Sequence, residues 1–151
     1  MFALTSPDFK DGEELADQFT YELFGQCGGE NISPALEWLG APAGTQTFAL
    51  TMLDPDGGNW LHWLLFDIPA DQTGLPQAAN GPENGTRGKN DFGKLGYGGP
   101  CPPSGAHRYI FTLYALDTTL GLPEGIKLKE FQNAIENHLL AQAQLTGLRT
   151  R

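Results

Sequence analysis

The chain has 151 residues, enough for one domain with a buried core, and we expect a single domain over 1–151. Its 40% of hydrophobic and 18% of charged residues are typical of a globular protein and exclude a disordered chain. The formal net charge of −9 would repel a phosphate backbone, so we expect no nucleic-acid partner.

The start of the chain, MFALTSPDFKDG, has neither the basic nor the apolar region of a signal peptide. No later run approaches the ~20 apolar residues of a membrane span. We therefore expect a soluble, cytoplasmic protein. In that compartment Cys27 and Cys101, whose spacing matches no zinc or redox motif, are expected to be reduced and partly buried. A disulfide between them remains the alternative, because both cysteines lie in glycine-rich loops that could bring them together.

Two patterned segments predict a β-hairpin. In 45–56, apolar residues recur at every second position, which indicates a strand. Segment 59–70 is short and almost continuously apolar, which is typical of a strand buried on both faces. The turn DPDGG at 54–58 joins the two. Strict alternation in the second strand places Trp60, His62, Leu64 and Phe66 on one face, and Leu61, Trp63 and Leu65 on the other. Trp38, Trp60 and Trp63 are assigned to the core.

The second half of the chain adds a long loop and further strands. Residues 71–106 show no periodic element, but Phe92 and Tyr97 predict that this loop packs against the domain. Segment 107–117 predicts a strand.

Apolar residues at helical spacing predict a helix over 128–139, in which His138 has a packing role. A last strand follows, with Ala141, Ala143 and Leu145 on one face. Mostly strands with a late helix predict a mainly β fold, a β-sandwich with peripheral helices.

The side chains able to do chemistry gather around two histidines. Asp54 and Asp56 stand at the tip of the hairpin that carries His62, so strand pairing about the turn brings them near this histidine. His107 and Tyr109 are two residues apart on a strand and point the same way. We therefore expect these five side chains to meet in one pocket.

Such a pocket suits a small anion. An aspartate that accepts a hydrogen bond from an imidazole favours the imidazolium, whose other nitrogen then donates. Together with a tyrosine hydroxyl and the backbone N–H groups of Gly98 and Gly99, two imidazolium rings would converge on a phosphate, sulfate or carboxylate. Anion binding should then weaken as the pH rises above the pKa values of the histidines.

Other interpretations stay open. His62, His107 and Asp54 or Asp56 could hold a metal ion, as in a metal-dependent hydrolase. Cys101 and His107 could form a nucleophilic pair. A Ser–His–Asp triad is disfavoured, because no serine lies in a GxSxG elbow. Each histidine could instead be a packing group of the core. Since no activated nucleophile or firm metal motif is evident, we expect no enzyme, no cofactor and no metal.

Five stretches carry a resemblance to a known family: NISPALEW (31–38), FALTMLDPD (48–56), HWLLFDIPA (62–70), GKNDFGKLGYGGPCPPSGAHRYIFTLYALD (88–117) and HLLAQAQLTG (138–147). In this order they resemble the phosphatidylethanolamine-binding protein (PEBP) family, most of all its bacterial and archaeal Raf-kinase-inhibitor-like branch. The resemblance covers nearly the whole chain. Its most specific part is the combination of DPD, the following histidine and GYGGPCPP-x-G-x-HRY.

The resemblance implies a PEBP-like β-sandwich built around a large antiparallel sheet, with a pocket for small anions that include phosphate head groups. The positions that match the pocket motif are Asp54, Asp56, His62, Gly99, Pro100, His107 and Tyr109. It also implies a modulator of kinases or a protease-inhibitor module. The expected partners are thus a small anion, phosphate or phospholipid head group, and a kinase or protease; a homodimer is left open.

The chain also departs from this branch. The turn between Asp56 and Trp60 is only GGN, and Leu61 stands where an aromatic residue is common, which predicts a reshaped pocket mouth. The helix that flanks the pocket in animal members is expected to be missing, because the chain ends soon after the last strand. Residues 9–31 are atypical of the family.

Overall fold

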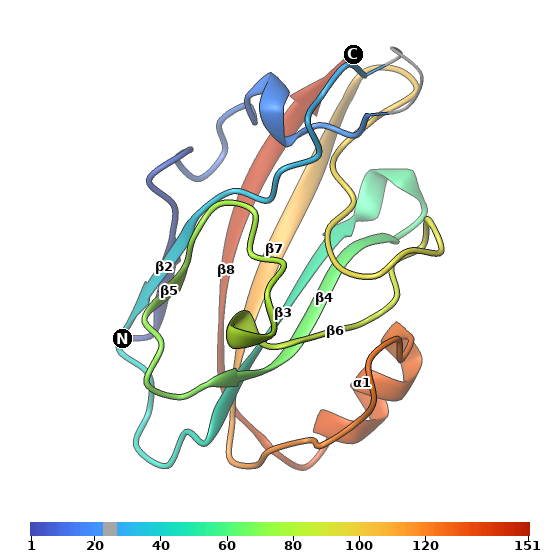
Figure 1. The fold of residues 1–151 in the computed structure, drawn as a ribbon. Coiled ribbons are helices and arrows are strands. Elements are labelled where there is room, and N and C mark those ends of the chain that lie inside the picture. Colours follow the sequence, from blue (N-terminus) through green and yellow to red (C-terminus); the bar gives the residue numbers. More distant parts are fainter. Residues whose placement is uncertain (23–26) are drawn as a thin grey trace.

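A computed structural model describes residues 1–22 and 27–151, so part of the atypical segment 9–31 lies outside the described residues. Within them, the strands form two antiparallel sheets, with the orders β6-β4-β3-β7-β8 and β1-β2-β5 (Figure 1). The expected mainly β fold is confirmed. The strands are β1 (Ala3–Thr5), β2 (Leu36–Leu39), β3 (Thr47–Asp54), β4 (Trp60–Pro69), β5 (Gly74–Leu75), β6 (Thr86–Arg87), β7 (Ala106–Leu116) and β8 (Leu139–Thr150). The helical elements are α1 (Leu128–Ile135) and the short 3-10 turns η1 (Asp17–Phe19), η2 (Pro55–Gly57) and η3 (Pro82–Asn84).

Both faces of the larger sheet are covered. One face packs on the smaller sheet, where Trp38 of β2 lies against Phe48 of β3 with ring centroids 5.4 Å apart. The other face packs on α1, whose Phe131 contacts Tyr114 of β7 at 5.5 Å between centroids. Because successive side chains of a strand point to opposite faces, and both faces are covered, the central strands are mostly apolar. Packing on both faces holds β3, β4 and β7 in place, and the predicted site residues lie at the ends of these strands.

The hairpin of β3 and β4 is confirmed, but a β-bulge breaks its alternation. Met52 pairs with Trp63 and Leu53 pairs with Leu61, so His62 is the extra residue that has no partner on β3. As a result Leu61 packs in the cluster under α1, on the face opposite Trp63. The prediction that Leu61 and Trp63 share a face was wrong, because a bulge shifts the two-residue period by one.

Three local predictions also need correction. The helix ends at Ile135, four residues earlier than expected. His138 is not a packing group: its side chain is 44% exposed and its Nδ1 lies 2.8 Å from Asp117 Oδ1. Trp60 is 39% exposed, whereas Trp38 and Trp63 are buried as expected. The strands β1 and β2 were not predicted, because each is too short to show a clear period.

The prediction of reduced cysteines was wrong. Cys27 and Cys101 form a disulfide, with their Cα atoms 5.6 Å apart. The loop after Tyr97 lies against the segment that follows η1, where the Tyr21 N–H donates to the Pro100 carbonyl at 3.0 Å. This long-range packing brings the two sulfurs together. Among the described residues, no helix is long and apolar enough to cross a membrane.

Candidate functional site: a cavity between two imidazoles

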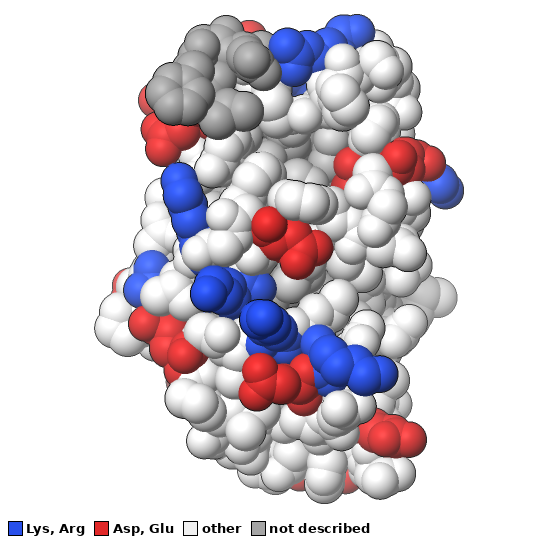
Figure 2. Space-filling view, turned by 90° about the vertical axis from the view of Figure 1, so that its right-hand side faces the viewer, with Lys and Arg blue, Asp and Glu red and all other residues white. Residues whose placement is uncertain are grey.

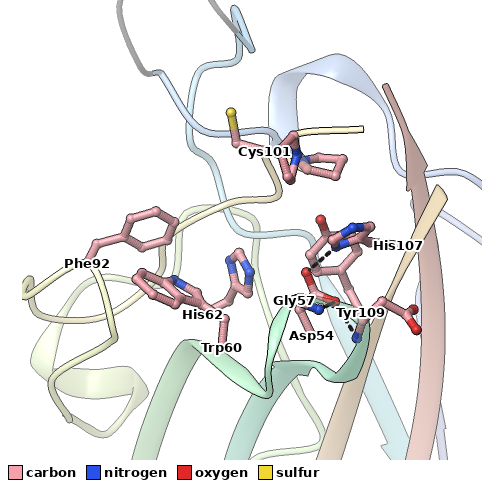
Figure 3. A pocket seen from close by; sticks show the side chains of 11 residues that line it. Asp54, Gly57, Trp60, His62, Phe92, Cys101, His107 and Tyr109 are labelled. Carbon is pink, nitrogen blue, oxygen red and sulfur yellow. Dashed lines mark hydrogen bonds and ion pairs between the residues drawn. The ribbon is translucent and has the colours of Figure 1, made fainter. Parts of the chain in front are cut away.

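A cavity of about 390 Å³ lies where β3 ends and where β4 and β7 begin (Figure 3). Its lining residues are Asp54, Asp56, Gly57, Trp60, His62, Phe92, Cys101, Pro102, Pro103, His107 and Tyr109. All five side chains expected to meet in one pocket are among them. That they bind a ligand stays a prediction. The cavity has a polar side at β3 and β7 and an aromatic side at Trp60 and Phe92.

Asp54 organises the polar side. Its Oδ1 accepts hydrogen bonds from the N–H groups of Asp56 and Gly57, both at 2.9 Å, and so caps η2. Its Oδ2 lies 2.7 Å from His107 Nδ1, which therefore carries the proton and donates it. The Asp54 side chain is only 6% exposed, so little water competes for these contacts. The hydrogen bond fixes the orientation of the His107 ring and leaves Nε2 for the cavity.

Asp56 contributes less directly. Its carboxylate forms a bidentate pair with the Arg108 guanidinium, at 3.0 Å to Nε and 2.9 Å to Nη2, and accepts the Arg108 N–H at 2.9 Å. These hydrogen bonds lower the pKa of Asp56 to about 2. Both aspartates line the same cavity as His62, as predicted, but their side-chain hydrogen bonds go to His107 and Arg108.

His62 is held by backbone rather than by a carboxylate. Its Nδ1 lies 2.6 Å from the Gly98 carbonyl, which can only accept, so Nδ1 carries the proton. The ring is 3% exposed and makes edge contacts with Tyr109 and Phe92. Burial lowers the pKa of His62 below its ordinary value of 6.5, against the opposing effects of the Gly98 carbonyl and the Asp54 charge.

The second nitrogen of His62 faces the cavity as a hydrogen-bond acceptor. His62 lines the cavity, and because its Nδ1 is bound to the Gly98 carbonyl, Nε2 is the ring nitrogen left for the cavity. In the neutral ring Nε2 carries a lone pair. The expectation of two charged imidazoles therefore fails at His62, because its partner is a neutral carbonyl in a buried place.

Tyr109 completes the polar side. It lies between the two histidines, with its ring centroid 5.1 Å from that of His62. Burial, followed by the nearby charges of Asp54 and Asp56, raises the pKa of its hydroxyl. The hydroxyl therefore stays protonated and can both donate and accept a hydrogen bond.

Gly99 and Pro100 lie behind the cavity wall rather than in it. The Gly99 N–H donates to Asn31 Oδ1 at 2.7 Å, and the Gly98 N–H donates to the His62 carbonyl at 2.7 Å. Neither N–H is free for a ligand, contrary to the expectation. A Cβ at Gly98 would overlap the Phe92 ring, and one at Gly99 would overlap the Phe19 carbonyl. These glycines allow the loop to pack closely on its neighbours.

Sequence reasoning missed the aromatic side and the residues that support it. Trp60 contacts Phe92 edge to face at 5.5 Å, and Phe92 stacks on Tyr21 at 4.2 Å between centroids. The buried Asn90 side chain accepts the N–H groups of Phe92 and Lys94 and so shapes this loop. The signal was present in KNDFGK (89–94), because asparagine before a glycine-containing turn often bonds the backbone that follows it.

This geometry gives little support to the catalytic interpretations. Cys101 is in the disulfide and has no thiol to pair with His107. In the described part of the chain, no three His, Cys, Asp or Glu side chains are arranged to hold a metal ion. Each imidazole already uses Nδ1 on a protein acceptor. What remains in the cavity is one nitrogen from each ring and a tyrosine hydroxyl.

The structure is thus a β-sandwich with a half-polar, half-aromatic cavity at the end of its larger sheet. A sequence model of the phosphatidylethanolamine-binding protein family matches residues 5–150. The chain belongs to this family.

Relatives and solved structures agree with this assignment. The chain is 46% identical to the UPF0098 protein of Methanothermobacter thermautotrophicus over 149 residues, which cover 95% of each chain. It is 39% identical to the UPF0098 protein YbhB of Escherichia coli, over 96% of this chain and 98% of the relative. The crystal structure of Escherichia coli YbcL, described as a new member of the mammalian PEBP family, superposes with a TM-score of 0.91 at 36% identity, covering 99% of this chain and 98% of YbcL.

Proposed function

We propose that this protein is a non-enzymatic binder of small anions of the phosphate class, including phosphate head groups. Through such an anion it would modulate a phosphorylated or kinase-type partner. The observation that carries the proposal is the convergence of His62 Nε2, His107 Nε2 and the Tyr109 hydroxyl on one cavity. Polar groups preorganised by other hydrogen bonds suit binding, because little order is lost when the ligand arrives.

The two imidazoles would play different roles. His107, when protonated beside Asp54, donates from Nε2 to an anionic oxygen. Neutral His62 offers a lone pair, so it would accept a hydrogen bond from a P–OH group. The cavity therefore suits a ligand that carries both a negative oxygen and a proton, as hydrogen phosphate does. The aromatic side, with Trp60 and Phe92, would contact the apolar part of a larger ligand.

Calorimetric titration with inorganic phosphate tests this proposal. The exchange His107→Ala should weaken binding about tenfold or more, since a hydrogen bond to a charged group contributes about 1.5–3 kcal/mol. His138→Ala is the matched control, because His138 also pairs with an aspartate but lies outside the cavity. Absence of phosphate binding, or equal loss in both variants, would refute the proposal. Kinase or protease inhibition that survives His62→Ala would instead favour a surface outside the cavity.

A further inference from the structure

A second cavity, of about 420 Å³, lies between the loop after β6 and the start of α1. We call it the lysine cavity; its lining residues are Lys89, Asn90, Asp91, Gly93, Lys127, Leu128 and Lys129. Two distant segments, 87–94 and 124–130, form it. The Lys89 N–H donates to the Ile126 carbonyl at 2.8 Å, and the Gly125 N–H donates to the Arg87 carbonyl at 2.9 Å. The backbone therefore fixes the position of both walls.

The three lysines of this cavity are exposed and form no ion pair with any described residue. The carboxylates of the two segments each hold a hydrogen bond or ion pair of their own, and of the three only Asp91 lines the cavity. Glu124 pairs with Arg87 at 3.3 Å, Glu130 accepts the Lys127 N–H at 3.2 Å, and Asp91 accepts the Leu61 N–H at 2.7 Å. The ammonium groups thus face solvent without a partner.

The positive charge here contrasts with the rest of the chain. Segments 87–94 and 124–130 hold five of the nine Lys and Arg residues of a chain with 18 acidic residues. Figure 2 shows Lys and Arg side chains in an oblique row across this face of the molecule, with acidic side chains on either side of the row. Lys127 and Lys129 also flank the first turn of α1, whose N-terminal N–H groups add to the positive potential.

We propose that the lysine cavity and the row around it form a docking site for an acidic polypeptide segment of a partner protein. The row is narrow, so an extended chain of carboxylates can follow it while staying clear of the acidic side chains beside it. A flat anionic membrane would contact those acidic side chains as well, and like charges repel. A nucleic-acid duplex, like a membrane, is broad and would also contact the acidic side chains beside the row.

The docking site is separate from the cavity of the two imidazoles. Asn90, Asp91 and Gly93 line the lysine cavity, whereas Phe92 lines the cavity of the two imidazoles. One loop thus separates the two cavities, and a partner could reach both. The inference does not depend on phosphate binding, because none of the three lysines lines the imidazole cavity.

Fluorescence anisotropy with a labelled octaglutamate peptide tests the inference at low and at physiological ionic strength. The intact protein should bind the peptide at low salt and lose affinity as salt screens the charges. The double exchange Lys127→Glu/Lys129→Glu should weaken binding about fivefold or more, from the usual worth of exposed charge pairs. These exchanges should not harm folding, because acidic residues are favourable at a helix N-terminus. Lys10→Glu, an exposed charge reversal outside both cavities, is the control.

Loss of peptide binding in the double variant, with little change in Lys10→Glu and His107→Ala, would support the docking site. Three results would overturn it. The first is the absence of peptide binding at low salt. The second is an equal loss in Lys10→Glu or in His107→Ala, which would indicate a general charge effect or binding in the imidazole cavity. The third is lysine-dependent binding to phosphatidylglycerol vesicles in place of the peptide, which would identify a lipid surface.

Discussion

Replacement of Asp54 by Asn removes one charge from the polar side of the cavity and keeps the shape of the side chain. Asp54 is 4% exposed and accepts three hydrogen bonds, two from backbone N–H groups and one from His107. In Asp54→Asn the amide oxygen can still accept the two N–H groups. The amide NH2 would then face His107 Nδ1, where two donors oppose each other.

The magnitude follows from these contacts. A hydrogen bond to a charged group contributes about 1.5–3 kcal/mol, and an unmatched buried donor costs about 1–3 kcal/mol. Part of this is recovered if His107 shifts its proton to Nε2, so we expect a net loss of about 2–3 kcal/mol in the free energy of unfolding. For a domain of this size, that corresponds to a fall of about 5–10 °C in Tm. Phosphate binding should weaken in the same variant, because His107 loses the acceptor that orients its ring toward the cavity.

Asp56→Asn is the matched control, two residues away. The Asp56 side chain is one-third exposed and its partner Arg108 more than half exposed, so solvent screens the pair and its loss should change stability little. Thermal unfolding followed by circular dichroism, with a phosphate titration of each variant, compares the two. Equal losses of stability in both variants would refute the assignment of Asp54 as the organising carboxylate.

The disulfide, the buried imidazole and the choice of anion give three more tests. The disulfide closes a stretch of 74 residues, so Cys27→Ser/Cys101→Ser should lose about 4 kcal/mol in urea unfolding; an unchanged midpoint would contradict the loop-closure account. Burial lowers the pKa of His62 below 6.5, so the unfolded chain protonates this imidazole more readily than the folded chain does. The contribution of His62 to the free energy of unfolding should therefore be fully present above pH 6.5 and decline as the pH falls below it. His62→Gln should reduce this acid sensitivity and His138→Gln should not; parallel pH profiles in all three proteins would argue against a buried neutral ring. At neutral pH phosphate should bind more tightly than sulfate, which has no proton to offer to His62, and equal affinities would rule out an acceptor at this position.

The parts of the fold that depend on local pattern could be predicted from the sequence. The alternation of 45–56, the turn after it and the face shared by His107 and Tyr109 all follow from the two-residue period of strands. The site residues on these strands were therefore placed near one another correctly. The family resemblance seen in the sequence includes these segments, and the family model matches residues 5–150.

The features that depend on distant contacts could not be predicted. The bulge at His62 depends on how the loop at Gly98 meets β4, since the His62 carbonyl accepts the Gly98 N–H in place of a ladder partner. The disulfide depends on where the segment after η1 lies. Asn31, whose Oδ1 accepts the Gly99 N–H, is 68 residues away from Gly99 along the chain. Periodicity carries no information about any of these contacts.

The most direct test of the anion cavity is nitrogen NMR of the histidine rings during a phosphate titration. The Nε2 signals of His62 and His107 should move together along one saturable curve, because both nitrogens contact the same ligand. The signals of His138 should stay in place. Ring signals of His62 and His107 that do not respond, or a response in which His138 moves as much as they do, would contradict the account.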